Sequence, residues 1–242
     1  MPSSANPVLG APRGDGLSLR QAAVITGLGY LLMPVTYAEF GLMPKLVVHG
    51  NIQQTVANLN AHTGLFAAAI LCYLITFCLD LVITWSLYIL LAPVNRALSL
   101  LAAGFRITYT MLGLVGLLKL VTVLQLIRTP IGSSALDAAG LQTQAQLMMS
   151  GFRSDWNFSL ILFGIHLVLV GSLIVRCSYI PKLLGVVLVI NGLGWVITSL
   201  QPIAYPGAHL GFLAVTYVGE LLFMLWLLIF GWRIKDPAPA GM

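Results

Sequence analysis

Ionisable side chains lie inside long apolar stretches of this sequence, where such residues are rare. They are Asp80, Arg106, His166 and Glu220, and Asn191 is a neutral polar companion. An ionisable residue at the centre of a membrane-spanning helix costs about 2.5–3.5 kcal/mol on insertion scales. Such residues normally face the interior of a helix bundle and pair with one another. We expect the same of these five.

Their positions along the predicted spans indicate a similar depth in the membrane. Counted from the nearest basic turn at the helical rise, Arg106, His166 and Asn191 lie about 14–15 Å deep. Asp80 and Glu220 lie about 20 Å deep by the same count. Because five separate helices place their most polar residue in one layer, the sequence predicts a common polar pocket near the middle of the membrane.

Helical spacing adds further side chains to this predicted layer. Residues three, four or seven positions apart share a face of a helix, which places Tyr, Thr or Ser side chains next to the acids and the arginine. The predicted ligand-binding residues are therefore Arg106, His166, Asn191, Tyr73, Thr76, Thr84, Thr110 and Tyr217.

The charges of the layer leave two interpretations open. One arginine cannot neutralise two carboxylates, and a buried acid without a counterion tends to hold a proton that it can donate near neutral pH. The functional interpretation makes Asp80 and Glu220 the catalytic acid and base. The structural interpretation is that one acid pairs with Arg106, the other stays protonated, and the layer only holds helices together. For His166 taken alone, a hydrogen-bonded packing role is favoured.

The sequence predicts neither a metal nor a cofactor. A haem would need a second histidine at the depth of His166, but His49, His62 and His209 all fall on the opposite, outer side. No HExxH or ExxH motif and no acidic cluster on a single helix is present. Three cysteines without CxxC spacing indicate neither a zinc site nor a disulfide framework.

The composition shows which kind of protein must position these residues. The chain has 242 residues, 59% of them hydrophobic and 8% charged, with a mean hydropathy of +0.95. A soluble domain carries about 25% charged residues, so a soluble globular domain is excluded, and so is disorder. The basic residues behind the net charge of +5 are scattered, which argues against a nucleic-acid partner.

Hydrophobic runs predict an all-α polytopic membrane bundle. A membrane-spanning helix needs about 20 mostly apolar residues, and the qualifying stretches are six: 21–43, 62–92, 97–127, 156–176, 183–200 and 209–232. We expect one domain over residues 21–235, a flexible cytoplasmic tail over 1–20 and a C-terminal tail over 236–242. Pro34 is predicted to kink the first span and Pro44 to end it, and no other span shows an interruption.

Basic residues set the predicted orientation. One side of the membrane carries Arg13, Arg20, Arg96, Arg176, Lys182, Arg233 and Lys235, whereas the other carries Lys45, Arg128 and Arg153. Both termini are therefore predicted to be cytoplasmic (N-in/C-in), in a bacterial inner membrane. Tight inner turns pair the second span with the third and the fourth with the fifth. Each outer segment, 44–61 and 129–155, is either a short amphipathic helix or a solvated connector. Gly164 and Gly171 are expected to be ordinary packing residues.

Three blocks of the sequence resemble a known family. The runs LDLVITWSLYILLAPVNRALSLLAAGFR (79–106), LILFGIHLVLVGSLIVRCSYIPKLLGVVLVINGLGWVI (160–197) and GELLFMLWLLIFG (219–231) are similar to the bacterial domain-of-unknown-function family 4386. Residues 128–155 match less well. The resemblance implies a small multi-pass inner-membrane protein without an established activity. Its motif residues here include Asp80, Pro93, Asn95, Arg96, Arg106, His166, Tyr179, Pro181, Gly219 and Glu220.

Three functional hypotheses follow. The first is a midplane pocket for a hydrophobic or lipid-like small molecule, with acid–base catalysis by Asp80 and Glu220. The second is an accessory or scaffold subunit of a membrane complex, with a membrane-protein partner or a second copy as its neighbour. The third is a proton-coupled transporter, which the lack of broken helices disfavours. In each case membrane lipid surrounds the protein.

Overall fold

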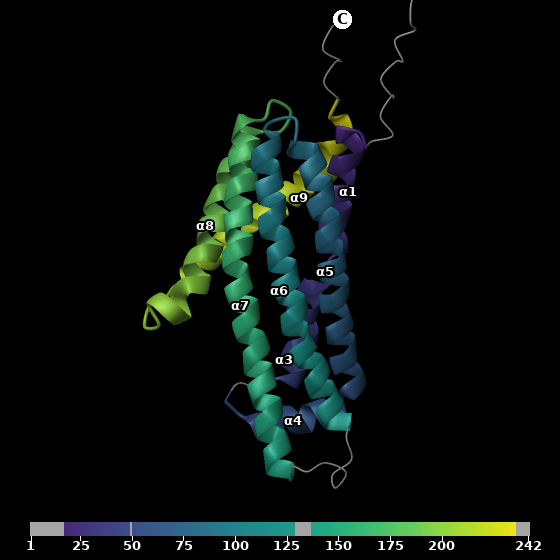
Figure 1. Ribbon diagram of the computed structural model, residues 1–242, viewed down its shortest axis with the longest axis vertical. Coiled ribbons are helices and arrows are strands. Elements are labelled where there is room, and N and C mark those ends of the chain that lie inside the picture. Colours follow the sequence, from purple (N-terminus) through teal and green to yellow (C-terminus); the bar gives the residue numbers. More distant parts are fainter. Residues whose placement is uncertain (1–16, 49, 129–136, 236–242) are drawn as a thin grey trace, which may run out of the picture.

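The computed structural model describes residues 17–48, 50–128 and 137–235, and the regular structure of these residues is helical throughout (Figure 1). Within them, six helical segments are long and apolar enough to cross a membrane. This confirms the predicted all-α bundle of six spans and makes the chain a multi-pass membrane protein. The predicted tails lie largely outside the described residues.

The first span is built from several short helices, and the others are long. The elements are α1 (Leu19–Leu32), α2 (Val35–Tyr37), η1 (Ala38–Leu42), α3 (Met43–Leu46), α4 (Ile52–Ala61), α5 (Thr63–Leu91), α6 (Arg96–Arg128), α7 (Ala138–Arg176), α8 (Lys182–Ala204), η2 (Gly211–Tyr217), α9 (Val218–Phe230) and η3 (Gly231–Arg233). The start of α1 and the end of η3 lie at the same end of the bundle as the α5–α6 and α7–α8 turns (Figure 1).

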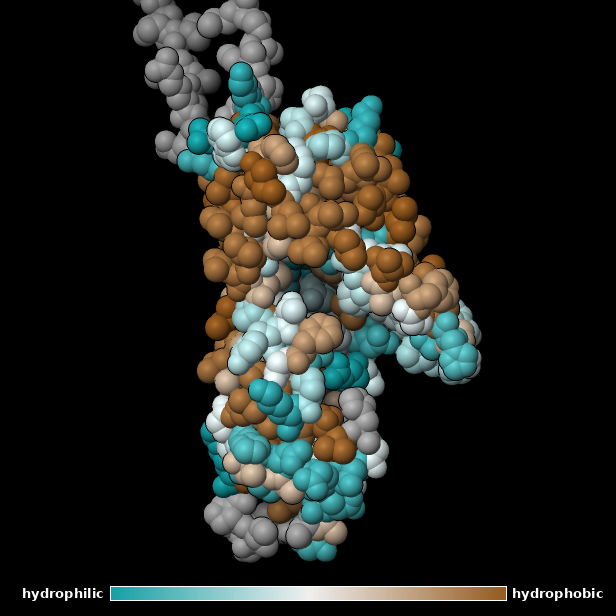
Figure 2. All heavy atoms as spheres, turned by 180° about the vertical axis from the view of Figure 1, so that it is seen from behind, coloured by the Kyte–Doolittle hydropathy of each residue, from teal (hydrophilic) through white to brown (hydrophobic). Residues whose placement is uncertain are grey.

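Helices α5, α6 and α7 are longer than a bilayer requires. They contain 29, 33 and 39 residues, or about 44, 50 and 58 Å at the helical rise, against a hydrocarbon layer of about 30 Å. Apolar side chains gather over the half of the bundle nearest the two tight turns, and hydrophilic ones cover much of the other end (Figure 2). The three helices are therefore expected to extend beyond the membrane at the end opposite the start of α1 and the end of η3.

The two outer segments differ from each other. Segment 44–61 contains α4, which lies across the end of the bundle (Figure 1), so the prediction of a short helix holds there. In segment 129–155, the described part continues the membrane helix, because α7 runs without a break from Ala138 to Arg176. The helix that contains the fourth predicted span thus begins well before residue 156.

The first and last spans are interrupted. Pro34 separates α1 from α2, because proline has no N–H to donate and clashes with the preceding turn. Pro44 does not end the span as expected, because it occupies the first turn of α3, where its missing N–H is not needed. The sixth span begins with the 3₁₀ segment η2 before α9. The expectation that only Pro34 interrupts a span is therefore wrong.

Glycines bring α7 and α8 into backbone contact. A Cβ atom on Gly171 would lie 2.5 Å from the Gly185 carbonyl oxygen, and one on Gly164 would lie 2.5 Å from the Gly192 carbonyl oxygen. Small residues allow this close approach between membrane helices. The structure thus favours a specific contact over the expected ordinary packing, and it confirms the predicted pairing of the fourth and fifth spans.

A hydrogen bond links the two tight turns. The Tyr179 hydroxyl, in the turn between α7 and α8, donates to the Leu90 carbonyl oxygen in the last turn of α5. That carbonyl has no partner within its own helix, as is usual at helix ends. Burial raises the pKa of Tyr179, which keeps the phenol protonated as the donor.

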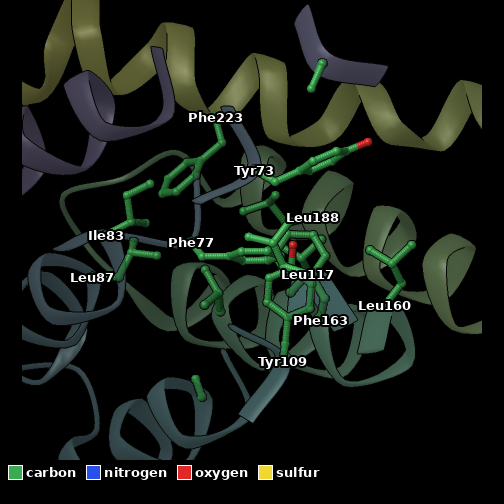
Figure 3. Close-up of a cluster of buried hydrophobic side chains, with 14 of the residues drawn as sticks. Tyr73, Phe77, Ile83, Leu87, Tyr109, Leu117, Leu160, Phe163, Leu188 and Phe223 are labelled. Atoms are coloured by element: carbon green, nitrogen blue, oxygen red, sulfur yellow. The ribbon is translucent and has the colours of Figure 1, made fainter. Parts of the chain in front are cut away.

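Aromatic side chains fill the core between α5, α6 and α7 (Figure 3). The centroids of the Tyr109 and Phe163 rings are 4.8 Å apart, and the Phe77 ring lies 5.7 Å from Trp156. Such offset and tilted pairs are favoured by the charge distribution of the rings. This cluster fixes the three long helices beside the polar residues described below.

The α7–α8 contact gives a first prediction. We expect Gly171→Ala to lower the thermal unfolding temperature of the detergent-purified protein, because the added methyl group meets backbone atoms and overpacking costs about 1–3 kcal/mol. Gly104→Ala is the matched control, since a Cβ atom there has no neighbour within 4 Å. The control should be neutral or stabilising by up to about 1 kcal/mol. Equal unfolding temperatures for the two variants would show that the close contact is unimportant.

Candidate functional site

Arg106 is the centre of the buried polar layer. Its side chain is 1% exposed, and its Nε and Nη2 atoms donate to Asp80 Oδ1 on α5 at 3.0 and 2.5 Å. Its Nη1 atom donates to the Tyr30 hydroxyl on α1 at 2.8 Å. One guanidinium thus connects three membrane segments, and its ion pair with Asp80 is the pair that the structural interpretation expects.

His166 holds the same guanidinium from the side of α7. Its Nδ1 atom lies 2.8 Å from the Ala102 carbonyl oxygen, which can only accept a hydrogen bond. Nδ1 therefore carries the proton, and Nε2 accepts from Arg106 Nη1 at 3.3 Å. The histidine orients Arg106 and ties α7 to α6, in agreement with the packing role favoured for it.

A cavity of about 330 Å³ lies against this layer. Its wall includes residues from all six spans: Tyr30, Met33, Val35, Thr36, Glu39, Phe40, Thr76, Asp80, Arg106, Tyr109, Trp156, Leu160, Phe163, Trp195 and Glu220. It is located where Pro34 breaks the first span and where α9 begins. A hollow is visible on the face shown in Figure 2, beside the projecting end of α8.

The cavity extends along the bundle from Asp80 and Arg106 to Trp156 and Glu39. Along α6, Arg106 lies about 15 Å from the tight turn at Arg96. Along α7, Trp156 lies about 30 Å from Arg176, close to the thickness of the hydrocarbon layer. The charged residues therefore form the deep end of the cavity, and Trp156 and Glu39 mark its outer end.

Two acids at the deep end keep unused hydrogen-bonding capacity. Asp80 Oδ2 is buried and has no hydrogen-bond partner in the described part of the chain. Glu220, in the first turn of α9, is partly buried and forms no ion pair with a described residue, although it interacts electrostatically with Arg106 and Asp80. The Trp195 side chain lies beside Glu220, but its Nε1–H is not in hydrogen-bond geometry with any described acceptor. The Glu220 carboxyl is the most accessible of these groups, and Asp80 Oδ2 lies enclosed in the cavity wall.

Glu39 at the outer end is fully engaged. Its Oε1 atom accepts from the Tyr73 hydroxyl, and its Oε2 atom accepts from Arg153 Nη1 at 3.2 Å. Tyr73 therefore reaches the cavity through Glu39 and does not line it, and its ring packs edge-on against Phe152 and Trp156. The predicted binding role of Tyr73 becomes a role in positioning Glu39.

The predicted site residues fall into two groups. The cavity brings together Asp80, Arg106, Glu220 and Thr76. Thr84 and Thr110 do not line it, and their hydroxyls donate to the backbone carbonyl oxygens of Asp80 at 2.6 Å and Arg106 at 2.9 Å, four residues earlier, as the Thr76 hydroxyl does to Cys72. A threonine that is satisfied in this way needs no partner across the bundle.

Asn191 and Tyr217 also lie behind the cavity wall. Asn191 is buried where α8 crosses α9. The two helices are close there, because a Cβ atom added to Gly219 would lie 2.9 Å from the Cβ atom of Asn191. Both polar atoms of its amide lack a partner among the described residues. Tyr217 stacks on Trp195 with ring centroids 3.9 Å apart, and its hydroxyl bonds to Thr198 at 2.9 Å. Both residues support the wall without reaching the cavity.

Several lining residues were not predicted. Tyr30, Trp156, Phe163 and Trp195 line the cavity, but an aromatic residue in a membrane span carries no energetic cost that would mark it in the sequence. Glu39 is marked by the energetic cost of an acid within the first span. Its position near the outer end of that span led us to leave it out of the predicted polar layer.

The comparisons with known proteins agree with this architecture. Residues 25–231 match the family described as Domain of unknown function (DUF4386). The chain belongs to the DUF4386 family. An uncharacterized protein from Archaeoglobus fulgidus is 29% identical over 158 residues, which cover 65% of this chain and 80% of that protein. No solved structure matches the DUF4386 chain significantly.

The matched range includes every residue of the charged layer. The match confirms the resemblance found in the sequence and assigns no activity to the DUF4386 chain. Among the described residues of this protein, no group of three or more histidine, cysteine, aspartate or glutamate side chains could hold a metal ion. The absence of a cofactor stays a prediction.

The buried pair gives a second prediction. We expect Arg106→Gln to destabilise the detergent-purified protein by about 3–5 kcal/mol, because it leaves the Asp80 carboxylate buried without a counterion. Lys119→Gln is the matched control, since it removes the 2.6 Å pair with Asp155, in which both side chains are about one-third exposed. An exposed pair contributes about 0–1 kcal/mol.

A double variant, Asp80→Asn with Arg106→Gln, removes both charges and should recover much of the lost stability. Chemical unfolding followed by circular dichroism measures all three variants. The assignment of Arg106 as the structural centre would be wrong if Lys119→Gln and Arg106→Gln were equally stable.

Proposed function

We propose that this DUF4386 protein binds a lipid-like small molecule in the cavity beside Arg106. The supporting observation is a cavity of about 330 Å³ whose wall is mostly aromatic and aliphatic, with an acid–arginine pair at its deep end. Small-molecule sites in proteins typically combine an apolar wall with a few polar groups that fix the orientation of the ligand. An amphipathic molecule would place its apolar part along Trp156 and Leu160 and its polar part near Asp80.

The broken first span supports entry from the bilayer. Phe40 of the first span lines the cavity and is 81% exposed, so the cavity is little covered at this point. In our proposal the ligand enters from the outer half of a bacterial inner membrane, with both chain termini in the cytoplasm. The basic residues near the termini and tight turns support this orientation.

The same site is suited to proton transfer. In the proposed chemistry, Glu220 exchanges a proton with the bound molecule, because it lines the cavity and has no ion-pair partner among the described residues. Asp80 has one oxygen fixed by Arg106 and the other free, so it is the second group that can accept or donate a proton. Thr76 lines the cavity one turn from Asp80 and would help to orient the ligand.

Tryptophan fluorescence in lipid nanodiscs tests binding. A variant in which Trp85, Trp226 and Trp232 are replaced by Phe keeps only the cavity residues Trp156 and Trp195. We expect dibromododecanol, which quenches indole on contact, to quench this variant with a saturable curve, because the cavity holds a limited number of molecules. A second variant that keeps only Trp85 and Trp232, which are 51% and 49% exposed, should be quenched in simple proportion to the probe in the bilayer.

Identical, non-saturable curves for the two variants would exclude a binding cavity. A competing molecule that is retained from the membrane would appear as a bound mass in native mass spectrometry, and its removal should increase quenching of Trp156 and Trp195. These two measurements therefore also detect a site that is already occupied.

Transport is a second candidate function, favoured by the two interrupted spans. Carriers often bind their substrate at the midplane next to discontinuous helices, and here the break after α1 lies at the cavity and the break before α9 leads to Glu220 in its wall. The sequence had disfavoured a transporter because the break before α9 carries no signal.

If the protein is a proton-coupled carrier, reconstituted liposomes should accumulate dibromododecylamine faster than protein-free liposomes, which take up the neutral amine passively, when a proton gradient is imposed. Glu220→Gln should abolish this acceleration, because it removes the titratable group. Asp155→Asn, which alters an acid of the exposed pair outside the cavity, should leave the acceleration unchanged. Saturable binding without any acceleration of gradient-dependent uptake would reject the carrier and leave the binding function intact.

A further inference from the structure

We infer that the cavity selects amphiphiles with a cationic head group that carries N–H donors, which is a protonated amine. This inference rests on the proposed binding function and adds the chemical class of the ligand. It is drawn from the charges, the unpartnered atoms and the aromatic rings of the cavity wall.

The charges of the wall do not balance. Its acids are Asp80, Glu220 and Glu39, and Arg106 is the basic residue among the described side chains that line it. Arg106 is paired with Asp80, and Glu39 is paired with Arg153. The Glu220 carboxyl therefore has no protein cation of its own, and the cavity carries one acid in excess.

Arg106 is poorly placed to receive an anion. Its nitrogen atoms already donate to Asp80, Tyr30 and His166, so an anionic head group would have to compete with these buried contacts. It would also meet the free Oδ2 atom of Asp80 and the Glu220 carboxyl at short range, where like charges repel strongly because the surroundings are apolar. The cavity is therefore unfavourable for carboxylates and phosphates, although Arg106 lines it.

The unpartnered Asp80 Oδ2 atom requires a hydrogen-bond donor. The aspartate side chain is 2% exposed, and nearly all buried polar atoms in proteins have a partner. A primary ammonium supplies three N–H donors and a positive charge. It can satisfy Asp80 Oδ2 and Glu220 together, whereas an alcohol can donate to only one of them.

Aromatic rings around the acids provide a second means of holding a cation. Trp195 lines the cavity beside Glu220, with Tyr217 stacked on its ring at 3.9 Å, and Trp156 lines the outer part. The guanidinium of Arg106 itself lies over the rings of Tyr30 and Phe163, at 5.1 and 5.3 Å. Cations are attracted to such ring faces, and choline-like head groups are bound in this way.

Three brominated probes with the same twelve-carbon chain test the inference: dibromododecylamine, dibromododecanol and dibromododecanoic acid. Binding is followed by quenching of the variant that retains only Trp156 and Trp195, in nanodiscs of zwitterionic lipid. The variant that retains Trp85 and Trp232 measures how much of each probe is in the bilayer. We expect the amine, which is charged at neutral pH, to bind at least about tenfold more tightly than the alcohol or the acid at equal bilayer concentration.

Glu220→Gln should lower the affinity for the amine about tenfold and that for the alcohol much less, because the substitution removes the charge and keeps the size of the side chain. Retained alcohol binding shows that the variant is folded, and Glu220→Asp should keep most of the preference for the amine. The control Asp155→Asn should change neither affinity, because this acid pairs with Lys119 outside the cavity.

The outcomes separate this inference from the proposed function. Saturable binding of the alcohol or the acid with no preference for the amine would overturn the cationic selectivity and leave the binding cavity in place. An amine preference that persists in Glu220→Gln would overturn the role of the excess acid. Non-saturable quenching by all three probes would overturn the binding function itself.

Discussion

The buried ion pair between Arg106 and Asp80 is the interaction on which the rest of the structure depends. Moving each of these charges out of water costs several kcal/mol even after relaxation, so the guanidinium must be satisfied from several directions. Asp80, Tyr30 and His166 do this from α5, α1 and α7. Because each contact requires its helix to sit at one depth and one rotation, the pair sets the register of four membrane segments and fixes the deep end of the cavity.

The interrupted spans follow from a second constraint, which is that backbone groups cannot stay unpaired in lipid. Irregular backbone at membrane depth is tolerated only where protein buries it or where it lines a cavity. The break at Pro34 lies at the cavity, with Met33 and Val35 in its wall, whereas η2 leads into the first turn of α9, from which Glu220 lines the cavity. The rigid α7–α8 contact allows α8 to lean away from the bundle so that η2 and α9 return across it (Figure 1).

The sequence predicts those features of the fold for which any other arrangement in a membrane would be energetically costly. Long apolar runs are needed to cross the membrane, so the number of spans is predictable, and Asp80, Arg106 and Glu220 are too costly in lipid to lie apart. Sharing a helix face with a charged residue is a weaker predictor of the cavity wall. Thr84 and Thr110 share such faces, but their hydroxyls donate to carbonyl oxygens of their own helices. The aromatic wall and the break before α9 leave no comparable signal, since Trp195 and the apolar residues of η2 suit an ordinary span equally well. Only the packing of α8 against α9 assigns them to the cavity.

The excess acid connects the two proposals about function. A proton and a cationic head group can each neutralise the Glu220 carboxylate. Only one of the two neutralises it at a time. Binding of the cation must then favour release of the proton, and protonation must weaken binding of the cation by the same factor, because thermodynamic coupling is reciprocal. A site of this kind couples ligand binding to proton release without any further residue or conformational change. In a membrane that separates two compartments, the same coupling drives exchange if the two broken spans open the cavity to each side in turn, and it remains simple selective binding if they do not.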